Sequence, residues 1–310
     1  MKSLLNHLDA YLAHAEAIQQ SPVHRRVFRF NVLRTLRWLE TTYAVVDPGR
    51  LTPTHLDGWF RHVTTRRTHK GVPLKSTSVA KQLQADRSFV LWLEKAGAVP
   101  AGLHEALPQI KVPDLLPTSI LDHSRMVRLL DRVDRTSPQG HQLSAMLEVL
   151  YSSGIRIAEL LALDIASVDL NAGLIRVRGK GDKERVVPVG ATARRLVESY
   201  LKGIRPTLQT EPGQTALWLD RSGARLPYHT FRRLLHGALQ EARINSPVTA
   251  HTFRRSCATE LIRGGASLWH VKDLLGHENV ETLKHYVRLT IVDLKKTHKK
   301  CHPREHGRRA

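Results

Sequence analysis

The chain has 310 residues, with 48 Lys and Arg against 28 Asp and Glu, which gives a formal net charge of +20 and a pI of about 10.5. Such a positive excess favours a polyanionic partner, either nucleic acid or an acidic membrane surface. No apolar run approaches the roughly 18 residues that a membrane span needs, and no basic segment leads into an apolar secretory one, so the membrane alternative is excluded.

The length and the two cysteines set further bounds. A chain of this size is expected to form about two domains. Cys257 and Cys301 make neither a disulfide framework nor a paired metal-binding motif, which predicts a reduced, cytoplasmic protein.

Residues 1–107 are predicted to form a compact helical domain. Leucines recur at helical spacing from Leu4 to Leu12, Thr52-Pro53 is expected to begin a later helix, and Ser76 or Thr77 to cap the next one. Basic residues gather around one loop and the following helix start: Arg61, Arg66, Arg67, Lys70, Lys75 and Lys81. A charge run is usually only a solvated face, but on a chain this basic a contact with the DNA backbone is an equally good interpretation. Residues 108–118 contain three prolines and predict a linker.

The second domain is expected from residue 119. An amphipathic helix from Leu143 to Leu150 ends at Ser152-Ser153-Gly154, and a new helix follows with Arg156 in its first turn. A cation at the positive end of a helix dipole is unfavourable, unless the cation and the helix terminus face a common anion. Pairing of Arg156 with Glu159 is the alternative, and the two interpretations are compatible.

Residues 173–189 alternate apolar and charged side chains around a Gly-Lys-Gly-Asp turn, which predicts a β-hairpin with Lys180 at its tip. Most lysines in such turns are merely solvated, so this signal is weak by itself. Further helices are predicted over residues 191–201 and 228–242, with a short extended piece at residues 216–219.

The stretch from His251 to Tyr286 carries the strongest functional signal. A helix over residues 251–262 places His251 and Arg254 on one face, with Phe253, Cys257 and Leu261 as its apolar stripe. Gly264-Gly265 ends that helix. A second helix begins after Ser267 and ends at Gly276, just before His277, and a third helical piece carries Tyr286. Each polar residue alone has a bland structural explanation, but together they indicate a site built around a phosphate.

The chain resembles a known family at this point. The segments GIRIAEL, RGKGDKER, HTFRR and LLGH, followed by Tyr286, resemble in order and spacing the tyrosine recombinases, which include phage integrases, Xer recombinases and Cre. The resemblance covers essentially the whole chain. It implies a mainly α fold with a small antiparallel β-sheet, in which residues 1–107 form a helical, SAM-like core-binding domain. It also implies a catalytic domain over residues 119–290 and a basic assembly tail over residues 291–310.

The resemblance also implies roles for single residues. Arg156 and Arg254 clamp the scissile phosphate, and Tyr286 attacks it to leave a covalent 3′-phosphotyrosyl link. The remaining roles are these: Lys180 is the general acid toward the 5′-oxygen, His251 helps to deprotonate the tyrosine, His277 hydrogen-bonds the phosphate, and Glu159 orients the site. The chain offers no carboxylate cluster for a metal, and the phosphotyrosine conserves the bond energy, so no metal and no nucleotide cofactor is expected.

The expected partners are double-stranded DNA with an inverted-repeat core site and a homo- or hetero-tetramer with another recombinase on two DNA sites. Two alternatives stay open. A tyrosine topoisomerase of the strand-swivelling type shares the same chemistry, although the tail after Tyr286 argues against it. A non-catalytic basic DNA-binding protein is disfavoured because every catalytic position is intact. Chromosome-dimer resolution, transposition and phage integration are all compatible with the sequence.

Overall fold

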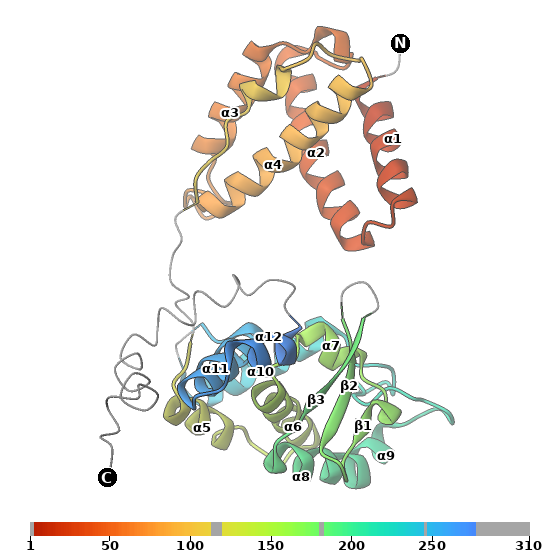
Figure 1. The fold of residues 1–310 in the computed structure, drawn as a ribbon, viewed down its shortest axis with the longest axis vertical. Coiled ribbons are helices and arrows are strands. Elements are labelled where there is room, and N and C mark those ends of the chain that lie inside the picture. The colour runs from red at the N-terminus through yellow and green to blue at the C-terminus, as the bar shows by residue number, and fades with distance from the viewer. Residues whose placement is uncertain (1–2, 113–119, 180–182, 245–246, 277–310) are drawn as a thin grey trace, which may run out of the picture. The chain divides into compact units, whose positions relative to one another are not determined.

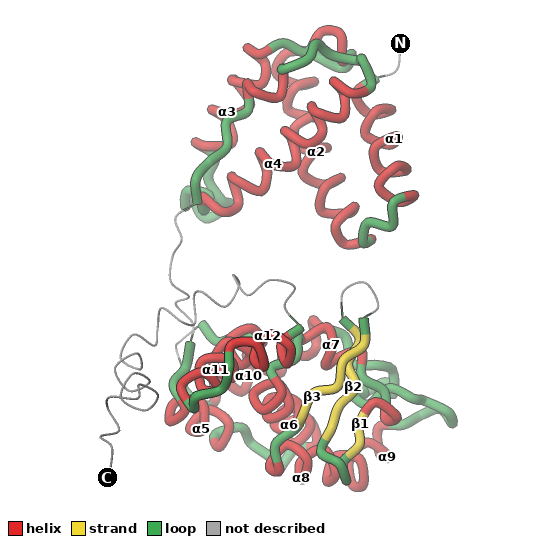
Figure 2. The backbone as a smooth tube through the Cα atoms, viewed as in Figure 1, coloured by secondary structure: helices red, strands yellow, loops and turns green. Residues whose placement is uncertain are grey.

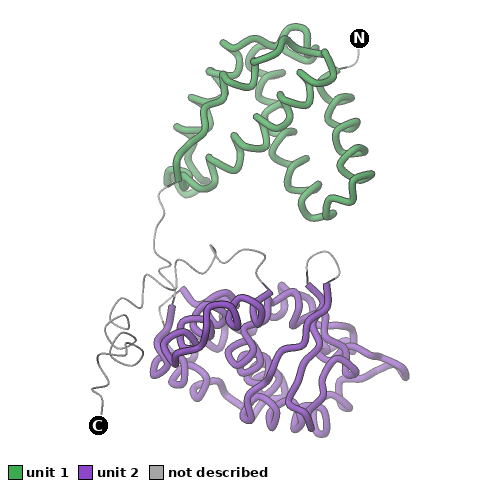
Figure 3. Tube along the Cα trace, viewed as in Figure 1, with its two compact units in different colours: residues 1–115 green, residues 116–310 purple. Residues whose placement is uncertain are grey.

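The computed structural model describes residues 3–112, 120–179, 183–244 and 247–276. The chain divides into two compact units, residues 1–115 and 116–310, which are coloured separately in Figure 3. Within the described residues, no helix is both long and apolar enough to cross a membrane.

The first unit is a helical bundle (Figure 1). Its helices are α1 (Leu4–Ala17), α2 (Pro22–Tyr43), α3 (Pro53–Thr65) and α4 (Ser76–Lys95), with short 3₁₀ turns at Pro48–Arg50 and Leu103–Ala106. Helix α2 contacts α1, α3 and α4, and Trp59 is fully buried among them. The predicted cap at Thr52 is confirmed, since its side chain accepts a hydrogen bond from the His55 backbone. The predicted cap of α4 is wrong by one residue, because Lys75 occupies that position and Ser76 is already helical.

A buried carboxylate lies at the centre of this bundle. Asp86 on α4 is 2% exposed and accepts hydrogen bonds from Trp59 Nε1 at 2.8 Å, Thr35 Oγ1 at 2.5 Å and Gln82 Nε2 at 3.0 Å. Burial disfavours the charged form and raises the pKa of Asp86 from 3.8 to about 6, although the three donors act in the opposite direction. The network therefore ties α2 and α3 to α4 around a group that titrates well above the usual range of an aspartate.

The second unit surrounds one buried helix with shorter helices and a small sheet (Figure 2). The helices are α5 (His123–Asp131), α6 (Pro138–Ser153), α7 (Ile157–Ala162), α8 (Ala191–Ser199), α9 (Arg205–Leu208), α10 (Tyr228–Glu241), α11 (Ala250–Arg263) and α12 (Leu268–Leu275), with a 3₁₀ turn at Ile165–Ser167 and a π-helical turn at Tyr200–Ile204. Helix α6 is buried along most of its length from Gln142 to Ser153, which is typical of a core helix. It contacts α8, α10 and α11.

The sheet confirms the predicted hairpin. Strands β2 (Leu174–Arg178) and β3 (Glu184–Pro188) pair antiparallel, with Ile175 opposite Val187 and Val177 opposite Arg185. A third strand, β1 (Val168–Asp169), was not predicted and extends the order to β1-β2-β3. Because side chains alternate between the two faces of a strand, Arg185 lies on the same face as the buried Val187.

The observed fold is thus mainly helical with a small antiparallel sheet, as predicted. Most helix ends in the second unit also follow the sequence. Ser267 caps α12 through a hydrogen bond from the Trp269 backbone, and Gly276 ends the helix in the left-handed conformation. One detail differs: Leu261, expected in the apolar stripe of α11, is 36% exposed.

Candidate active site

The start of α7 is organised around Glu159. Arg156 occupies the N-cap position, and not the first turn that was predicted. Its backbone N–H donates to Glu159 Oε2 at 2.8 Å, and its Nη1 donates to Oε1 at 2.9 Å. The expected pairing of these two residues is therefore present, and the Glu159 carboxylate itself satisfies the helix terminus.

A second arginine, not singled out in the sequence, completes this pair. Arg185 on β3 donates from Nη1 to Glu159 Oε1 and from Nη2 to Oε2, both at 2.9 Å. The Glu159 side chain is 4% exposed and that of Arg185 is 16% exposed. Burial by itself raises the pKa of Glu159, but the hydrogen bonds from Arg185 and Arg156 outweigh it, so the pKa lies below its ordinary value. The carboxylate is consequently ionised and fixed in orientation.

Three arginine side chains of the site contact the C-terminal end of α12. Its last carbonyl oxygens have no partner within the helix and carry the negative end of the helix dipole. Arg185 Nε donates to Leu274 O at 3.0 Å, Arg254 Nη2 to Leu275 O at 2.7 Å, and Arg156 Nη2 to Gly276 O at 3.0 Å. Three guanidinium groups from β3, α11 and α7 therefore converge on consecutive carbonyls, one residue before His277.

Two glycines allow this close approach. Gly154 has φ +64°, and a Cβ there would lie 2.7 Å from Leu275 Cδ2 and 3.2 Å from Cys257 Sγ. Gly276 has φ +62°, and a Cβ there would lie 3.1 Å from the Arg185 guanidinium. Both positions thus need the left-handed backbone and the absence of a side chain.

Helix α11 supplies the other two predicted residues. Arg254 is 5% exposed and donates from Nη1 to Gly154 O at 2.6 Å. His251, one turn earlier, lies at the exposed edge of the helix. Partial desolvation, and then the positive charges of Arg255, Arg254 and Arg156, lower the pKa of His251. The imidazole is therefore neutral near neutral pH and is able to accept a proton.

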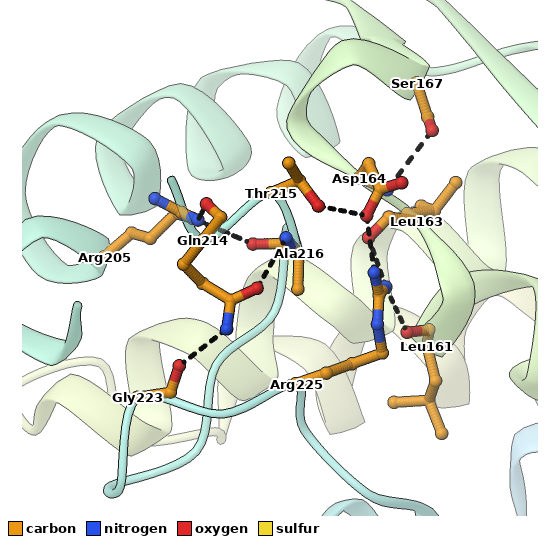
Figure 4. A network of polar contacts seen from close by, with 10 residues as sticks. All are labelled: Leu161, Leu163, Asp164, Ser167, Arg205, Gln214, Thr215, Ala216, Gly223 and Arg225. Atoms are coloured by element: carbon orange, nitrogen blue, oxygen red, sulfur yellow. Dashed lines mark hydrogen bonds and ion pairs between the residues drawn. The ribbon is translucent and has the colours of Figure 1, made fainter. Parts of the chain in front are cut away.

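A separate network anchors the far end of α7 (Figure 4). Arg225 Nη1 donates to Leu161 O at 3.1 Å and to Leu163 O at 2.9 Å, and Arg225 also pairs with Asp164. The nearby Arg205 is buried and donates from Nε to Ala216 O at 3.0 Å. These contacts hold α7 at its C-terminal end, while Glu159 and its arginines hold the N-terminal end.

The structure places only some of the predicted site residues. Arg156, Glu159, His251 and Arg254 lie together. Lys180, His277 and Tyr286, as well as the tail 291–310, fall outside the described residues. Among the residues that the structure describes, no group of three or more His, Cys, Asp or Glu is placed to hold a metal ion.

The predicted DNA-contacting cluster belongs to the first unit. Arg61 lies on α3 and pairs with Asp57, and Arg67 donates to Gly71 O within the loop between α3 and α4. The rest of the cluster follows that loop into α4: Arg66, Lys70, Lys75 and Lys81. Arg34 on α2 lies close to this cluster. Desolvation, and then the positive charge of Arg66, lower the pKa of Arg34. No local pattern predicts this proximity, because helix α3 separates Arg34 from the loop in the sequence.

The second unit has the mainly helical fold with a small antiparallel sheet that the resemblance to the tyrosine recombinases implies. Comparison with known proteins agrees. The model of the phage integrase family matches residues 119–291. The chain is 34% identical over 271 residues to the tyrosine recombinase XerD of Listeria innocua, covering 86% of this chain and 88% of that protein. It is 31% identical over 308 residues to the tyrosine recombinase XerC of Mycobacterium sp. strain JLS, covering 98% of this chain and all of that protein, 100%.

Solved structures show the same fold. A XerH site-specific recombinase bound to a palindromic difH substrate matches with a TM-score of 0.69 and 18% identity, over 89% of this chain and 79% of that one. A lambda integrase dimer bound to a COC′ core site matches with a TM-score of 0.70 and 13% identity, over 92% and 95%. The chain therefore belongs to the phage integrase family and is a tyrosine-type, site-specific DNA recombinase. The comparisons lend no support to the topoisomerase alternative.

Proposed function

We propose that this recombinase cleaves and rejoins DNA with the residues Arg156, Lys180, His251, Arg254, His277 and Tyr286, supported by Glu159. The observation that carries the proposal is the convergence of Arg156 and Arg254 on the last carbonyls of α12. That convergence brings the buried Arg254 and the partly exposed Arg156 to the point where the chain continues to His277. Guanidinium groups at such a point match the geometry of a phosphate.

The two arginines stabilise the transition state of phosphoryl transfer. Attack on a phosphodiester places additional negative charge on the two non-bridging oxygens, and preorganised donors lower the energy of that state more than that of the substrate. Arg156 is held for this by Glu159, and Arg254 by the carbonyls of Gly154 and Leu275. These contacts fix the orientation of both guanidinium groups, and donors held in this way need little reorganisation during the reaction.

Proton transfer completes the chemistry. His251, kept neutral by partial desolvation and then by its arginine neighbours, accepts the proton of the Tyr286 hydroxyl as that oxygen attacks phosphorus. The bond to the 5′-oxygen breaks, Lys180 protonates this leaving oxygen, and a 3′-phosphotyrosyl link remains. His277 hydrogen-bonds a phosphate oxygen. Attack by another strand's 5′-hydroxyl on the phosphotyrosine reverses these steps and releases Tyr286.

The DNA partner and the assembly follow from the same reaction. Strand exchange needs two duplexes, and we propose a homo- or hetero-tetramer on two inverted-repeat core sites in the cytoplasm. The basic cluster from Arg61 to Lys81 contacts the DNA backbone, and residues 291–310 pass to a neighbouring subunit in a closed ring. Deletion of residues 290–310 should then leave single-site binding intact and abolish strand exchange.

The deciding experiment uses a plasmid with two copies of a target site, recovered by footprinting on genomic DNA. Recombinase activity gives exchanged products, in EDTA as well as in Mg²⁺. Relaxation of supercoils without exchange would identify a topoisomerase instead. Binding without any cleavage would identify a non-catalytic DNA-binding protein.

A further inference from the structure

Arg185 connects three segments that are distant in the sequence. Its side chain extends from β3 of the hairpin and donates hydrogen bonds to both carboxylate oxygens of Glu159 on α7, each at 2.9 Å. It also donates to Leu274 O at the end of α12, at 3.0 Å. The Arg156 side chain, by comparison, donates to the Oε1 atom of Glu159. The hairpin that carries Lys180, the helix start that carries Arg156, and the helix end before His277 are thereby joined by one guanidinium.

Fold stability alone would not require an ion pair here. The Arg185 side chain lies on the inward face of β3, opposite Val177 and two residues before the buried Val187. Replacement of a whole buried ion pair by well-packed apolar side chains is often neutral or stabilising, whereas removal of one partner is destabilising. An apolar side chain at position 185 alone would leave Glu159 buried without its bidentate partner. Since Glu159 also accepts a hydrogen bond from Arg156, a displaced Glu159 would change the orientation of Arg156 in the phosphate clamp.

We propose that Arg185 is a positioning residue for DNA cleavage. It fixes Glu159, which orients Arg156 toward the phosphate, and it fixes the Leu274 carbonyl, which sets where the chain leaves α12 toward His277. This inference rests on the proposed function, because it assigns Arg185 a part in the same reaction without contact to the reacting atoms.

The geometry requires the planar fork of arginine. Arg185 uses Nη1 and Nη2 on Glu159 and Nε on Leu274 O, three donors in one rigid plane. A lysine keeps the charge but concentrates its donors on one atom, so it cannot reproduce these contacts together. Arg185→Lys therefore separates positioning from simple charge compensation.

The first measurement is the single-turnover rate of covalent adduct formation on a nicked suicide site, at saturating protein. We expect Arg185→Lys to bind the site as the parent protein does and to form adduct about 100-fold more slowly, the scale of a small misplacement of catalytic groups. Arg176→Lys is the matched control, because Arg176 is an exposed arginine on the neighbouring strand β2. It should form adduct at the parental rate.

The second measurement is the pH dependence of that rate, which a purely structural role would not change. The charged groups that donate hydrogen bonds to Glu159 are Arg156 and Arg185. His251 on α11 is also titratable, and after desolvation the charges of Arg254 and Arg156 contribute to lowering the pKa of His251. In Arg185→Gln the pKa of Glu159 rises, so the carboxylate becomes protonated at a higher pH. The acidic limb of the rate profile should therefore move to higher pH, whereas Arg176→Gln should leave it in place.

The outcomes separate this inference from the function beneath it. If the parent protein forms no adduct, the proposed function fails. If the parent forms adduct and Arg185→Lys does so equally fast, the positioning role is wrong while the function stands. A slow Arg185→Lys with an unchanged profile for Arg185→Gln would also overturn the role. If Arg185→Gln does not fold, as judged by circular dichroism, the rate of Arg185→Lys decides alone.

Discussion

Replacement of Arg254 tests the phosphate clamp at its most buried member. Arg254 is 5% exposed and donates to Gly154 O at 2.6 Å and to Leu275 O at 2.7 Å. Arg254→Ala leaves two buried carbonyls without these donors, at about 1–3 kcal/mol each, so the free energy of unfolding should fall by roughly 2–6 kcal/mol. In the transition state, loss of one oxyanion donor costs about 2.7–4 kcal/mol, or roughly 10²–10³ in rate.

The loss of folding stability and the loss of transition-state stabilisation are separated by measuring unfolding and the cleavage rate on the same variants. Thermal unfolding gives the folded fraction, and adduct formation on a nicked site, at a temperature where each variant is folded, gives the rate. Arg254→Lys preserves the charge and should still be slowed, because it lacks the paired donors. Arg263→Ala on the same helix is the control, since its partner Glu260 and its own side chain are partly exposed and such pairs contribute only about 0–1 kcal/mol. Folded Arg254→Lys that cleaves at the parental rate would refute the clamp.

Three further predictions address other parts of the chain. The pKa of Asp86 is about 6 in the fold and 3.8 ordinarily, so its proton stabilises the fold fully below about pH 3.8, and this contribution is lost as the pH rises through about 6. Asp86→Asn should remove up to about 3 kcal/mol of that pH dependence in denaturant titrations, and an unchanged pH dependence would contradict the buried carboxylate. Gly154→Ala should lower the free energy of unfolding by about 2–4 kcal/mol through backbone strain and overlap with Leu275. Gly97 has φ +66° and nothing within 4 Å of an added Cβ, so Gly97→Ala should lose only the free energy that backbone strain costs. Equal losses of stability in the two variants would exclude the overlap between a Cβ at position 154 and Leu275. Lys180→Ala should be rescued by a substrate with sulfur at the 5′-bridging position, because a thiolate leaves without a proton, and equal impairment on both substrates would remove Lys180 from the acid role.

Local signals explain which elements could be predicted. Thr52, Ser267 and Gly276 mark helix ends because capping depends on neighbouring backbone groups alone. The short strand β1 was missed, since two residues carry no periodic pattern. Its pairing with β2 depends on tertiary contacts that the local sequence does not contain.

The site shows the same division between local and long-range information. Arg156, Glu159, His251 and Arg254 stand in short motifs, and the resemblance of these motifs to the tyrosine recombinases implies their roles. Arg185 stands in a run of charges next to a turn, where an arginine is usually solvated, and only the register of β3 turns it inward to Glu159. The one local hint was its two-residue spacing from Val187 on an alternating strand. Two of the three contacts at the end of α12, those of Arg156 and Arg185, join residues more than 80 positions apart, for which a single sequence contains no evidence.

In the proposed reaction, Tyr286 becomes covalently joined to the 3′-phosphate of cleaved DNA. This bond is tested by incubating the protein with a nicked suicide site, digesting the adduct with protease, and identifying the DNA-linked peptide by mass spectrometry. We expect the link to map to Tyr286, and we expect Tyr286→Phe to bind the same DNA but to form no adduct. A link at another residue, or an adduct formed by Tyr286→Phe, would contradict this reaction.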